Sequence, residues 1–159
     1  MFGILFQRFS SPFLLYFHSL MRKHLHIING PNLNLLGTRE TEIYGSVPFD
    51  EYLEQLRMQF PKLNITFFQS NVEGEIINNL HEMGFKASGI LMNAGGFTHT
   101  SIAIGDAVTA IPAPVVEIHI SNIFAREEFR HKSFIAPNAM GIISGFGLES
   151  YRLGILYFI

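Results

Sequence analysis

From residue 24 onward, the chain alternates between short apolar segments and segments of helical period. Five segments are short, apolar and rich in β-branched residues, and we expect them to form strands: His24 to Asn29, Asn64 to Gln69, Gly89 to Ala94, Pro114 to Ile120 and Met140 to Gly145. Elsewhere apolar residues recur at spacings of three and four, which predicts helices: Phe49 to Phe60, Glu73 to Met83, Ser101 to Ala110 and Leu148 to Tyr157. Parallel strands need a crossover long enough to hold a helix, so the alternation predicts an α/β fold with a parallel sheet.

Five such units fit the flavodoxin-like strand order 2-1-3-4-5. The predicted fold class is therefore a three-layer α/β sandwich with a five-stranded parallel sheet. In sheets of this order, ligands bind beyond the carboxyl ends of the strands, near the point where the strand order reverses. Neither an internal repeat nor a linker interrupts the pattern. We therefore expect residues 21–159 to form a single domain, with its function in the loops at one end of the sheet.

Residues 1–20 differ from the rest of the chain. They are rich in phenylalanine, contain no acidic residue and follow no clean helical or strand period. Arg8 is the only early charge, and residues 18–20 would make a poor cleavage site for a secretory signal. We interpret residues 1–20 as an appended segment outside the fold, with Met21 as the functional start. A partner-docking or oligomer-contact arm is the alternative.

The composition limits the classes of function to consider. A chain of 159 residues with 48% hydrophobic and 15% charged residues can bury a core, which excludes disorder. The 11 basic residues against 13 acidic ones argue against a nucleic-acid surface, and no apolar run approaches the ~18 residues of a membrane span. The absence of cysteine excludes thiolate zinc sites and cysteine nucleophiles. The absence of cysteine does not by itself name a compartment. We expect a cytoplasmic protein that binds neither nucleic acid nor membrane.

Polar residues gather in the loops that follow three of the predicted strands. These loops are residues 30–45 after the first strand, 93–101 after the third and 117–130 at the end of the fourth. The carboxyl ends of parallel strands meet at one end of the sheet, so asparagine, arginine, tyrosine, histidine and serine side chains converge there. Such a convergence is typical of a small-molecule site.

Glu117 and His119 are two residues apart on a predicted strand, so their side chains point to the same face. A carboxylate in a strand that is buried on both faces is costly unless it is paired. We favour a functional pair in which the glutamate orients the imidazole and the other ring nitrogen exchanges a proton with substrate. A structural polar pair at the sheet end or at a subunit contact is the alternative.

Arg39 and Tyr44 lie between two glycines, an arrangement typical of a hinged lid. Tyrosine is a poor base at neutral pH, but a guanidinium held close to it stabilises the phenolate. Arg39 or Arg126 could supply that guanidinium. A surface loop with a solvated arginine and a packed tyrosine explains the pattern equally well.

Three further groups fit the binding of anions and hydroxyls. The backbone of residues 93–96 can face an anion at a helix start, although two adjacent glycines often form only a tight turn. His99 and Asp106 could share a helix face; a capping histidine and a solvated aspartate are the alternative. Arg126 and Arg130, four apart on a predicted short helix, could clamp a carboxylate. A solvated basic face balanced by neighbouring glutamates is the simpler account.

Several cofactor and metal sites are disfavoured. No glycine-rich dinucleotide loop follows the first strand, and no phosphate-binding loop of the GxxxxGK type is present. The four lysines lie outside the polar clusters, so a Schiff-base mechanism has no candidate amine. For His24 and His26 we favour a hydrogen-bonded core or edge pair over metal ligands. We expect neither a cofactor nor a metal.

Three motifs carry a family resemblance: GPNLNLLGTRE followed by YG, NAGGFTHTSIAI, and VEIHISN followed by AREEFRHKS. In this order they resemble the type II 3-dehydroquinate dehydratases, from about Arg22 to the C-terminus. The resemblance implies a flavodoxin-like fold assembled as a homododecamer, a tetramer of trimers, without metal or cofactor. It also implies an activity. Water is removed from 3-dehydroquinate through an enolate, giving 3-dehydroshikimate in the shikimate pathway of aromatic amino acid biosynthesis.

The resemblance further implies a role for each site residue. In the chemistry, Tyr44 takes the C2 proton, Arg39 keeps that tyrosine ionised, Asn32 holds the water that stabilises the enolate oxygen, His119 protonates the departing C1 hydroxyl and Glu117 orients His119. The hydroxyls and carboxylate of the substrate are bound by Asn93, His99, Asp106, the backbone at Ile120 and Ser121, and Arg130. Arg126 closes with the lid.

The sequence departs from the family pattern at Thr41, where proline is usual, at Gly105, where a bulky or basic residue is more usual, and at Ala110, where some members carry an acidic residue involved in packing or a neighbouring subunit. Two other functions stay open. One is a catalytically silent flavodoxin-like binding paralogue, against which the intact proton-transfer residues count. The other is a flavin- or phosphate-binding protein that uses the loop at Gly95 and Gly96.

Overall fold

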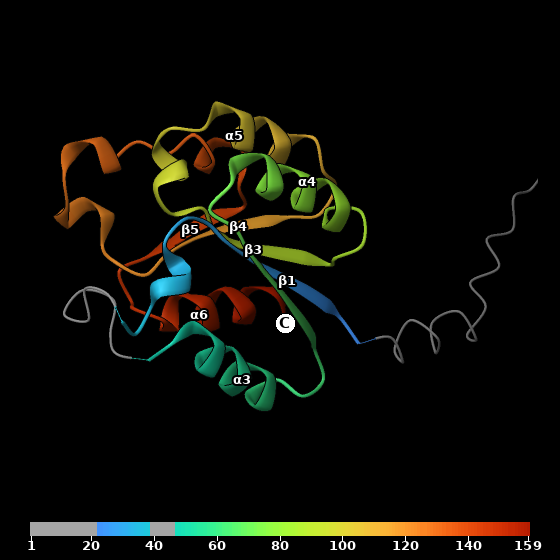
Figure 1. Cartoon of the computed structure of the whole chain (residues 1–159). Coiled ribbons are helices and arrows are strands. Elements are labelled where there is room, and N and C mark those ends of the chain that lie inside the picture. Colours follow the sequence, from blue (N-terminus) through green and yellow to red (C-terminus); the bar gives the residue numbers. More distant parts are fainter. Residues whose placement is uncertain (1–21, 39–46) are drawn as a thin grey trace, which may run out of the picture.

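The computed structural model, which describes residues 22–38 and 47–159, confirms the predicted α/β fold class (Figure 1). Its strands form one parallel sheet in the predicted order, β2-β1-β3-β4-β5. The strands are β1 (His24–Asn29), β2 (Asn64–Gln69), β3 (Gly89–Asn93), β4 (Val115–His119) and β5 (Gly141–Ser144). The expectations for residues 1–20, Arg39, Thr41 and Tyr44 lie outside the described residues.

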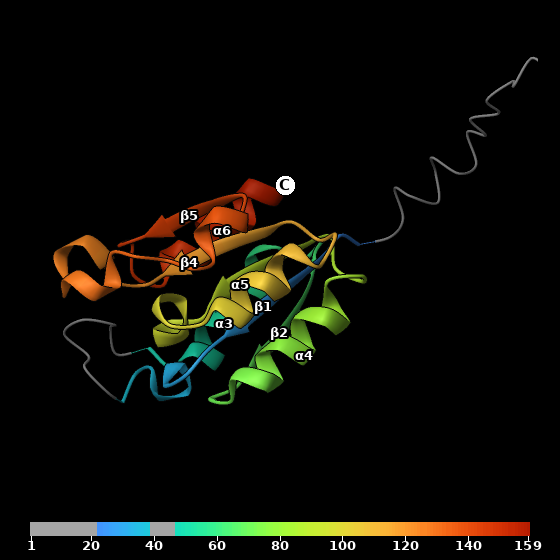
Figure 2. The same ribbon diagram turned by 90° about the horizontal axis from the view of Figure 1, so that it is seen from above.

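Helices cover both faces of the sheet, which makes the structure a three-layer sandwich (Figure 1, Figure 2). One face carries α3 (Phe49–Gln59) and α6 (Glu149–Phe158), and the other carries α4 (Glu73–Met83) and α5 (Ile102–Thr109). The connections contain the short 3₁₀ helices η1 (Leu33–Leu35), η2 (Gly95–His99), η3 (Ile123–Ala125), η4 (Glu128–Arg130) and η5 (Ala136–Asn138). Within the described ranges, no helix is long and apolar enough to cross a membrane.

Some element ends differ slightly from the sequence prediction. β4 begins after Pro114, which has no N–H to donate to a neighbouring strand. The helix expected from Ser101 begins at Ile102, because Ser101 is its cap: the serine oxygen accepts a hydrogen bond from the backbone N–H of Ile104 (2.9 Å). Residues 95–99, expected as a loop, form η2.

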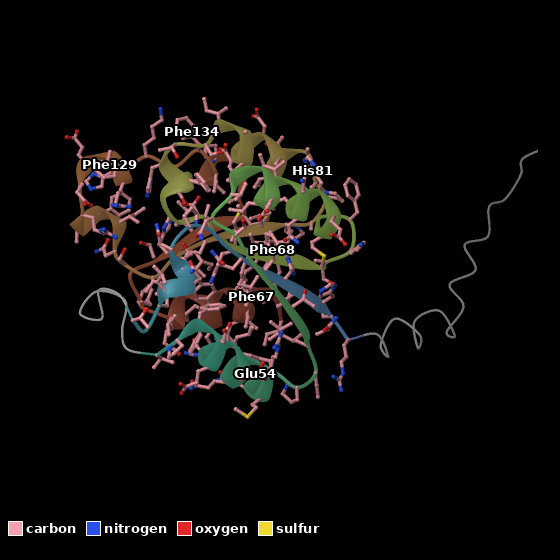
Figure 3. All side chains as sticks on the ribbon, in the orientation of Figure 1. Glu54, Phe67, Phe68, His81, Phe129 and Phe134 are labelled. Atoms are coloured by element: carbon pink, nitrogen blue, oxygen red, sulfur yellow. The ribbon has the colours of Figure 1, made fainter. Side chains whose placement is uncertain are left out.

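Neighbouring side chains of a strand point to opposite faces of the sheet, and this alternation divides the core into two halves. Figure 3 shows Phe67 directed toward the layer of α3 and Phe68 toward the layer of α4. In β1, Leu25 and Ile27 pack in the half that contains α3 and α6, and Ile28 packs in the half that contains α4 and α5. Burying each such side chain contributes about 1.5–3 kcal/mol, so β1, an inner strand of the sheet, anchors both halves of the core.

Gly30 allows the end of β1 to approach the end of β3. A Cβ atom on residue 30 would lie 2.3 Å from the carbonyl oxygen of Ala94, closer than non-bonded atoms come. Across the same approach, the backbone N–H of Gly30 donates to the carbonyl of Asn93 (2.7 Å). The loops after β1 and β3 therefore begin next to each other, at the point where the strand order reverses.

Candidate active site

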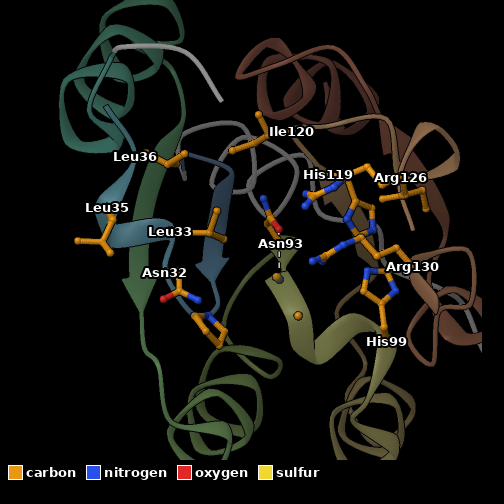
Figure 4. A pocket seen from close by; sticks show the side chains of 14 residues that line it. Asn32, Leu33, Leu35, Leu36, Asn93, His99, His119, Ile120, Arg126 and Arg130 are labelled. Carbon is orange, nitrogen blue, oxygen red and sulfur yellow. Dashed lines mark hydrogen bonds between the residues drawn. The ribbon is translucent and has the colours of Figure 1, made fainter. Parts of the chain in front are cut away.

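A cavity lies at the carboxyl ends of β1, β3 and β4, where the sequence predicts the polar loops to meet (Figure 4). Its walls come from the loop after β1, from η2 and from the segment after β4. The lining residues are Pro31, Asn32, Leu33, Leu35, Leu36, Asn93, Gly95, Gly96, His99, His119, Ile120, Ile123, Arg126 and Arg130. Most of the predicted site residues in the described part of the chain therefore line one cavity.

His119 and Glu117 form a buried pair at the end of β4, on the shared face that their spacing predicts. Nε2 of His119 lies 2.6 Å from Oε1 of Glu117, and the glutamate side chain is fully buried. An ionised carboxylate can only accept a hydrogen bond, so Nε2 carries the proton between them. Nδ1 is then the ring nitrogen that remains to exchange a proton with a bound molecule.

The second carboxylate oxygen of Glu117 also has a partner. Oε2 accepts a hydrogen bond from the hydroxyl of Ser133 (2.7 Å), which stands 16 residues further along the chain. A buried carboxylate is costly unless hydrogen bonds or an opposite charge compensate for lost water. Ser133 and His119 supply this compensation from two different segments.

His99 ends η2, and its ring stacks on that of His119 with the centroids 6.0 Å apart and 17° between the planes. Its Nδ1–H donates to the backbone carbonyl of Lys132 (2.8 Å), which can only accept. Burial lowers the pKa of His99, and the nearby His119 and Arg130 lower it further, against the Lys132 carbonyl and Glu117, which raise it. The ring is therefore favoured in its neutral form, in which Nε2 can accept a hydrogen bond from a hydroxyl group.

Arg126 and Arg130 both line the cavity and both contact Glu127. Oε2 of Glu127 lies 2.8 Å from Nε of Arg130 and 3.4 Å from Nε of Arg126. Hydrogen bonds from its own backbone amide and from Arg130 lower the pKa of the Glu127 carboxyl. The two arginines do not share a helix as predicted, because the backbone of Arg126 is extended after η3 and only Arg130 belongs to η4.

Two asparagines belong to the polar wall of the cavity. Asn93 ends β3; its Nδ2 donates to the hydroxyl of Tyr151 (2.9 Å), and its Oδ1 accepts from the backbone N–H of Gly95 (3.3 Å). Asn32 has a left-handed backbone, with φ of 67°, which asparagine tolerates better than most residues. Its N–H donates to Oδ1 of Asn71 (2.9 Å).

The remaining predicted residues lie beside the cavity or away from it. Ser121 follows the lining residue Ile120, and its Oγ accepts a hydrogen bond from Arg126 (3.4 Å). Asp106 is exposed on α5 and does not line the cavity. It does not share a helix with His99 as predicted, because η2 ends at His99 and α5 begins only at Ile102.

Sequence reasoning missed the residues that support the cavity from outside it. Ser133 ends the motif AREEFRHKS, but nothing in the motif indicates its contact, and Tyr151 belongs to the apolar pattern of the last helix. Asn71 stood in no motif. Each hydrogen-bonds a site residue at least 16 positions away, and no local spacing reveals such a contact.

The cavity combines two imidazoles, two guanidinium groups and two asparagine amides. Such a set can bind a small anion that carries hydroxyl groups and transfer a proton to it. Among residues 22–38 and 47–159, no three His, Asp or Glu side chains gather closely enough to hold a metal ion.

The fold and the site together define a flavodoxin-like α/β protein with a polar cavity at its strand-order reversal. Comparison with known proteins identifies the family. The model of the class II dehydroquinases matches residues 23–159, and the chain belongs to this family.

The chain is similar to the 3-dehydroquinate dehydratase of Caldicellulosiruptor bescii, with 52% identity over 136 residues that cover 84% of this chain and 94% of that protein. Among solved structures, the type II dehydroquinase from Propionibacterium acnes superposes with a TM-score of 0.82 at 36% identity, covering 86% of this chain and 96% of that one. The type II dehydroquinase from Butyrivibrio crossotus superposes with a TM-score of 0.81 at 39% identity, covering 86% and 97%.

Proposed function

We propose that this chain is a 3-dehydroquinate dehydratase, a hydro-lyase that converts 3-dehydroquinate to 3-dehydroshikimate. The observation that carries the proposal is the buried Glu117–His119 pair, which opens onto a cavity with His99 and Arg130. Elimination of water beside a ketone needs a base for the carbon-bound proton, stabilisation of the enolate and an acid for the departing hydroxyl. The family to which the chain belongs supports this reaction.

Proton removal is assigned to Tyr44. The phenolate takes the C2 proton, Arg39 keeps the tyrosine ionised, and Asn32 holds the water that stabilises the enolate oxygen. Asn32 lines the cavity. Arg126 also lines it and closes with the lid that carries Arg39 and Tyr44.

Departure of the C1 hydroxyl is assigned to His119. The enolate electrons form the new double bond as the C1–O bond breaks, and Nδ1 of the imidazolium gives its proton to the leaving oxygen. Glu117 holds Nε2 on the opposite side of the ring, which fixes the ring orientation. The tyrosine proton and the imidazole are then reset by exchange with solvent, so the products are the enone and water.

Substrate binding is assigned to the polar groups in and beside the cavity. Arg130 takes the carboxylate, for which a guanidinium offers paired donors. His99 accepts a hydrogen bond from a substrate hydroxyl through Nε2, and Asn93 and the backbone at Ile120 and Ser121 bind the other polar groups. No lysine lines the cavity in the described part of the chain, which fits a mechanism without an imine.

We also propose that the enzyme is a cytoplasmic homododecamer, a tetramer of trimers. Three large apolar side chains are between 62% and 68% exposed: Phe124, Phe129 and Phe146. Exposed apolar surface of this kind is often covered by a partner subunit. Asp106 is exposed and does not line the cavity of its own subunit. We therefore assign it to binding the substrate of a neighbouring subunit. Residues 1–20 are proposed to be separate from the catalytic domain, residues 21–159. The oligomeric state is tested by light scattering.

The test of the activity is direct. Chelator-treated protein is mixed with 3-dehydroquinate, and the ultraviolet absorbance of the conjugated enone product is followed. We expect turnover, no inactivation when borohydride is added with the substrate, and loss of turnover in the His119→Ala variant. A folded oligomer without turnover would contradict the proposal and favour the silent binding paralogue. If the sample is disordered or monomeric, the assay is repeated with protein that starts at Met21.

A further inference from the structure

Glu117 is held from two sides, and only one side belongs to the mechanism described above. Its Oε1 faces His119 at 2.6 Å, and its Oε2 faces the hydroxyl of Ser133 at 2.7 Å. The glutamate side chain has no exposed surface. A carboxylate without water depends on the protein for its hydrogen bonds, and here it receives one at each oxygen.

The hydroxyl proton of Ser133 is committed to Glu117. Ser133 Oγ accepts two backbone hydrogen bonds, from the N–H of Ile135 (3.0 Å) and from the N–H of Ala136 (2.9 Å). A serine hydroxyl has one proton and two lone pairs. With both lone pairs engaged by N–H donors, its proton points to Oε2 of Glu117, a charge-assisted hydrogen bond.

The segment around Ser133 is itself anchored to the site. The carbonyl of Lys132 accepts from His99 (2.8 Å), and the N–H of Phe134 donates to the carbonyl of Thr98 (2.9 Å). Gly105 of α5 gives this segment room, since a Cβ there would lie 2.4 Å from the carbonyl oxygen of Phe134. The position of the serine oxygen is therefore determined by backbone contacts.

We infer that Ser133 is a positioning residue for proton transfer: its hydroxyl fixes the Glu117 carboxylate so that Oε1 remains aimed at Nε2 of His119. Ser133 does not line the cavity, so its proposed role is indirect, through Glu117. Without its hydroxyl, Oε2 loses its donor, and the carboxylate can turn or draw in water. His119 then loses its defined orientation while the binding groups stay in place. This inference rests on the proposed dehydratase activity.

The chain offers a matched control for this serine. Ser70 makes nearly the same hydrogen bonds: its hydroxyl donates to Oε2 of Glu75 (2.5 Å) and accepts from the N–H of Val72 (2.9 Å), two residues further on. Glu75 is exposed and lies outside the cavity. Ser70→Ala therefore removes the same kind of contacts without affecting the Glu117–His119 pair.

The experiment compares steady-state kinetics of the full chain with those of Ser133→Ala, Ser133→Thr and Ser70→Ala. We expect Ser133→Ala to lower kcat about 10- to 100-fold, the worth of a hydrogen bond to a charged group, with KM changed less than about threefold. Ser133→Thr retains the hydroxyl and restores most of kcat. Ser70→Ala keeps the kcat of the wild type. If Ser133→Ala does not fold, Ser133→Cys takes its place, since a thiol of similar size is a weak donor and is expected to lower kcat as well.

A second readout does not depend on turnover. In protein labelled with ¹⁵N-histidine, the His119 signals are assigned by their loss in His119→Ala. We expect them to shift in Ser133→Ala and to stay unchanged in Ser70→Ala. Wild-type kcat together with unshifted His119 signals in the Ser133→Ala variant would overturn the inference, and so would equal losses in Ser133→Ala and Ser70→Ala. Absence of turnover in the wild type contradicts the proposed function instead, and the spectra still decide the role of Ser133.

Discussion

The amide of Asn93 in the cavity wall donates a hydrogen bond of 2.9 Å to the hydroxyl of Tyr151, although 58 residues separate them. Tyr151 is fully buried on α6 and in turn donates to Oδ1 of Asn29 (2.7 Å). Burial raises the pKa of Tyr151, so the phenol stays protonated and able to donate. Tyr151 of α6 thereby orients the amide of Asn93, a residue that lines the cavity.

We expect Tyr151→Phe to reduce both stability and substrate binding. The change removes the partner of Oδ1 of Asn29 and of Nδ2 of Asn93, at a cost of about 1–3 kcal/mol per group. The freed Asn93 amide should raise KM more than it lowers kcat. Tyr52→Phe is the control: the Tyr52 hydroxyl donates to Glu149 (3.3 Å) away from the cavity, so its loss should leave KM unchanged. An equal effect of the two variants on KM would contradict the role of Tyr151.

Variants of the two proposed proton-transfer residues, His119 and Tyr44, should separate the chemical step from substrate binding. His119→Ala removes the proposed acid, and general acid–base groups typically contribute about 10²- to 10⁴-fold to the rate. We expect a loss of kcat in that range, with a substrate analogue still binding by calorimetry. Tyr44→Phe should behave in the same way. Near-wild-type kcat in either variant would remove that residue from its assigned role.

Gly30→Ala should destabilise the protein, because the new methyl group would overlap the backbone of Ala94. Backbone atoms cannot move aside as a flexible side chain can, and such overpacking costs about 1–3 kcal/mol or more. Gly74→Ala, in the first turn of α4, should instead stabilise by about 0.5–1 kcal/mol, because nothing beyond its chain neighbours and its own helix backbone lies within 4 Å of the added methyl. Urea unfolding at one protein concentration measures both changes in the free energy of unfolding. Two changes of the same sign would contradict the prediction.

His26 predicts a pH dependence of stability. Both of its ring nitrogens are engaged, Nδ1 with the hydroxyl of Thr66 (2.7 Å) and Nε2 with Oδ1 of Asn79 (2.8 Å), as favoured for this histidine over metal binding. Burial lowers its pKa; His24 lowers it further, against Asn79 and Glu82, which raise it. The folded state therefore resists protonation more than the unfolded chain does.

The sign of the pH effect follows from this lowered pKa. The contribution of His26 to stability is complete above the unfolded pKa, about 6.5, and is lost as pH falls through the folded pKa. Urea unfolding at pH 7.5 and pH 5.5 should show a smaller loss in His26→Gln than in the wild type. His81→Gln, an exposed histidine on α4, should keep the wild-type loss. An unchanged loss in His26→Gln would contradict the prediction.

Much of the fold could be predicted because its determinants are local. The alternation of strand and helix patterns is written in neighbouring residues, and the rules for parallel crossovers then leave few strand orders. The pairing of Glu117 with His119 was predictable for the same reason, since a two-residue spacing on a strand determines the shared face. The motifs identified the other cavity residues through their resemblance to a family.

The contacts that hold the site in place were decided only by the tertiary structure. The sequence alone determined which residues alternate on a strand, which segments form helices and which loops meet at the strand ends. Packing determined that Ser133 contacts Glu117, that Tyr151 contacts Asn93, and that Asp106 lies outside the cavity lining. Secondary structure follows short periods along the chain, whereas these contacts join distant segments whose meeting depends on how the helices cover the sheet.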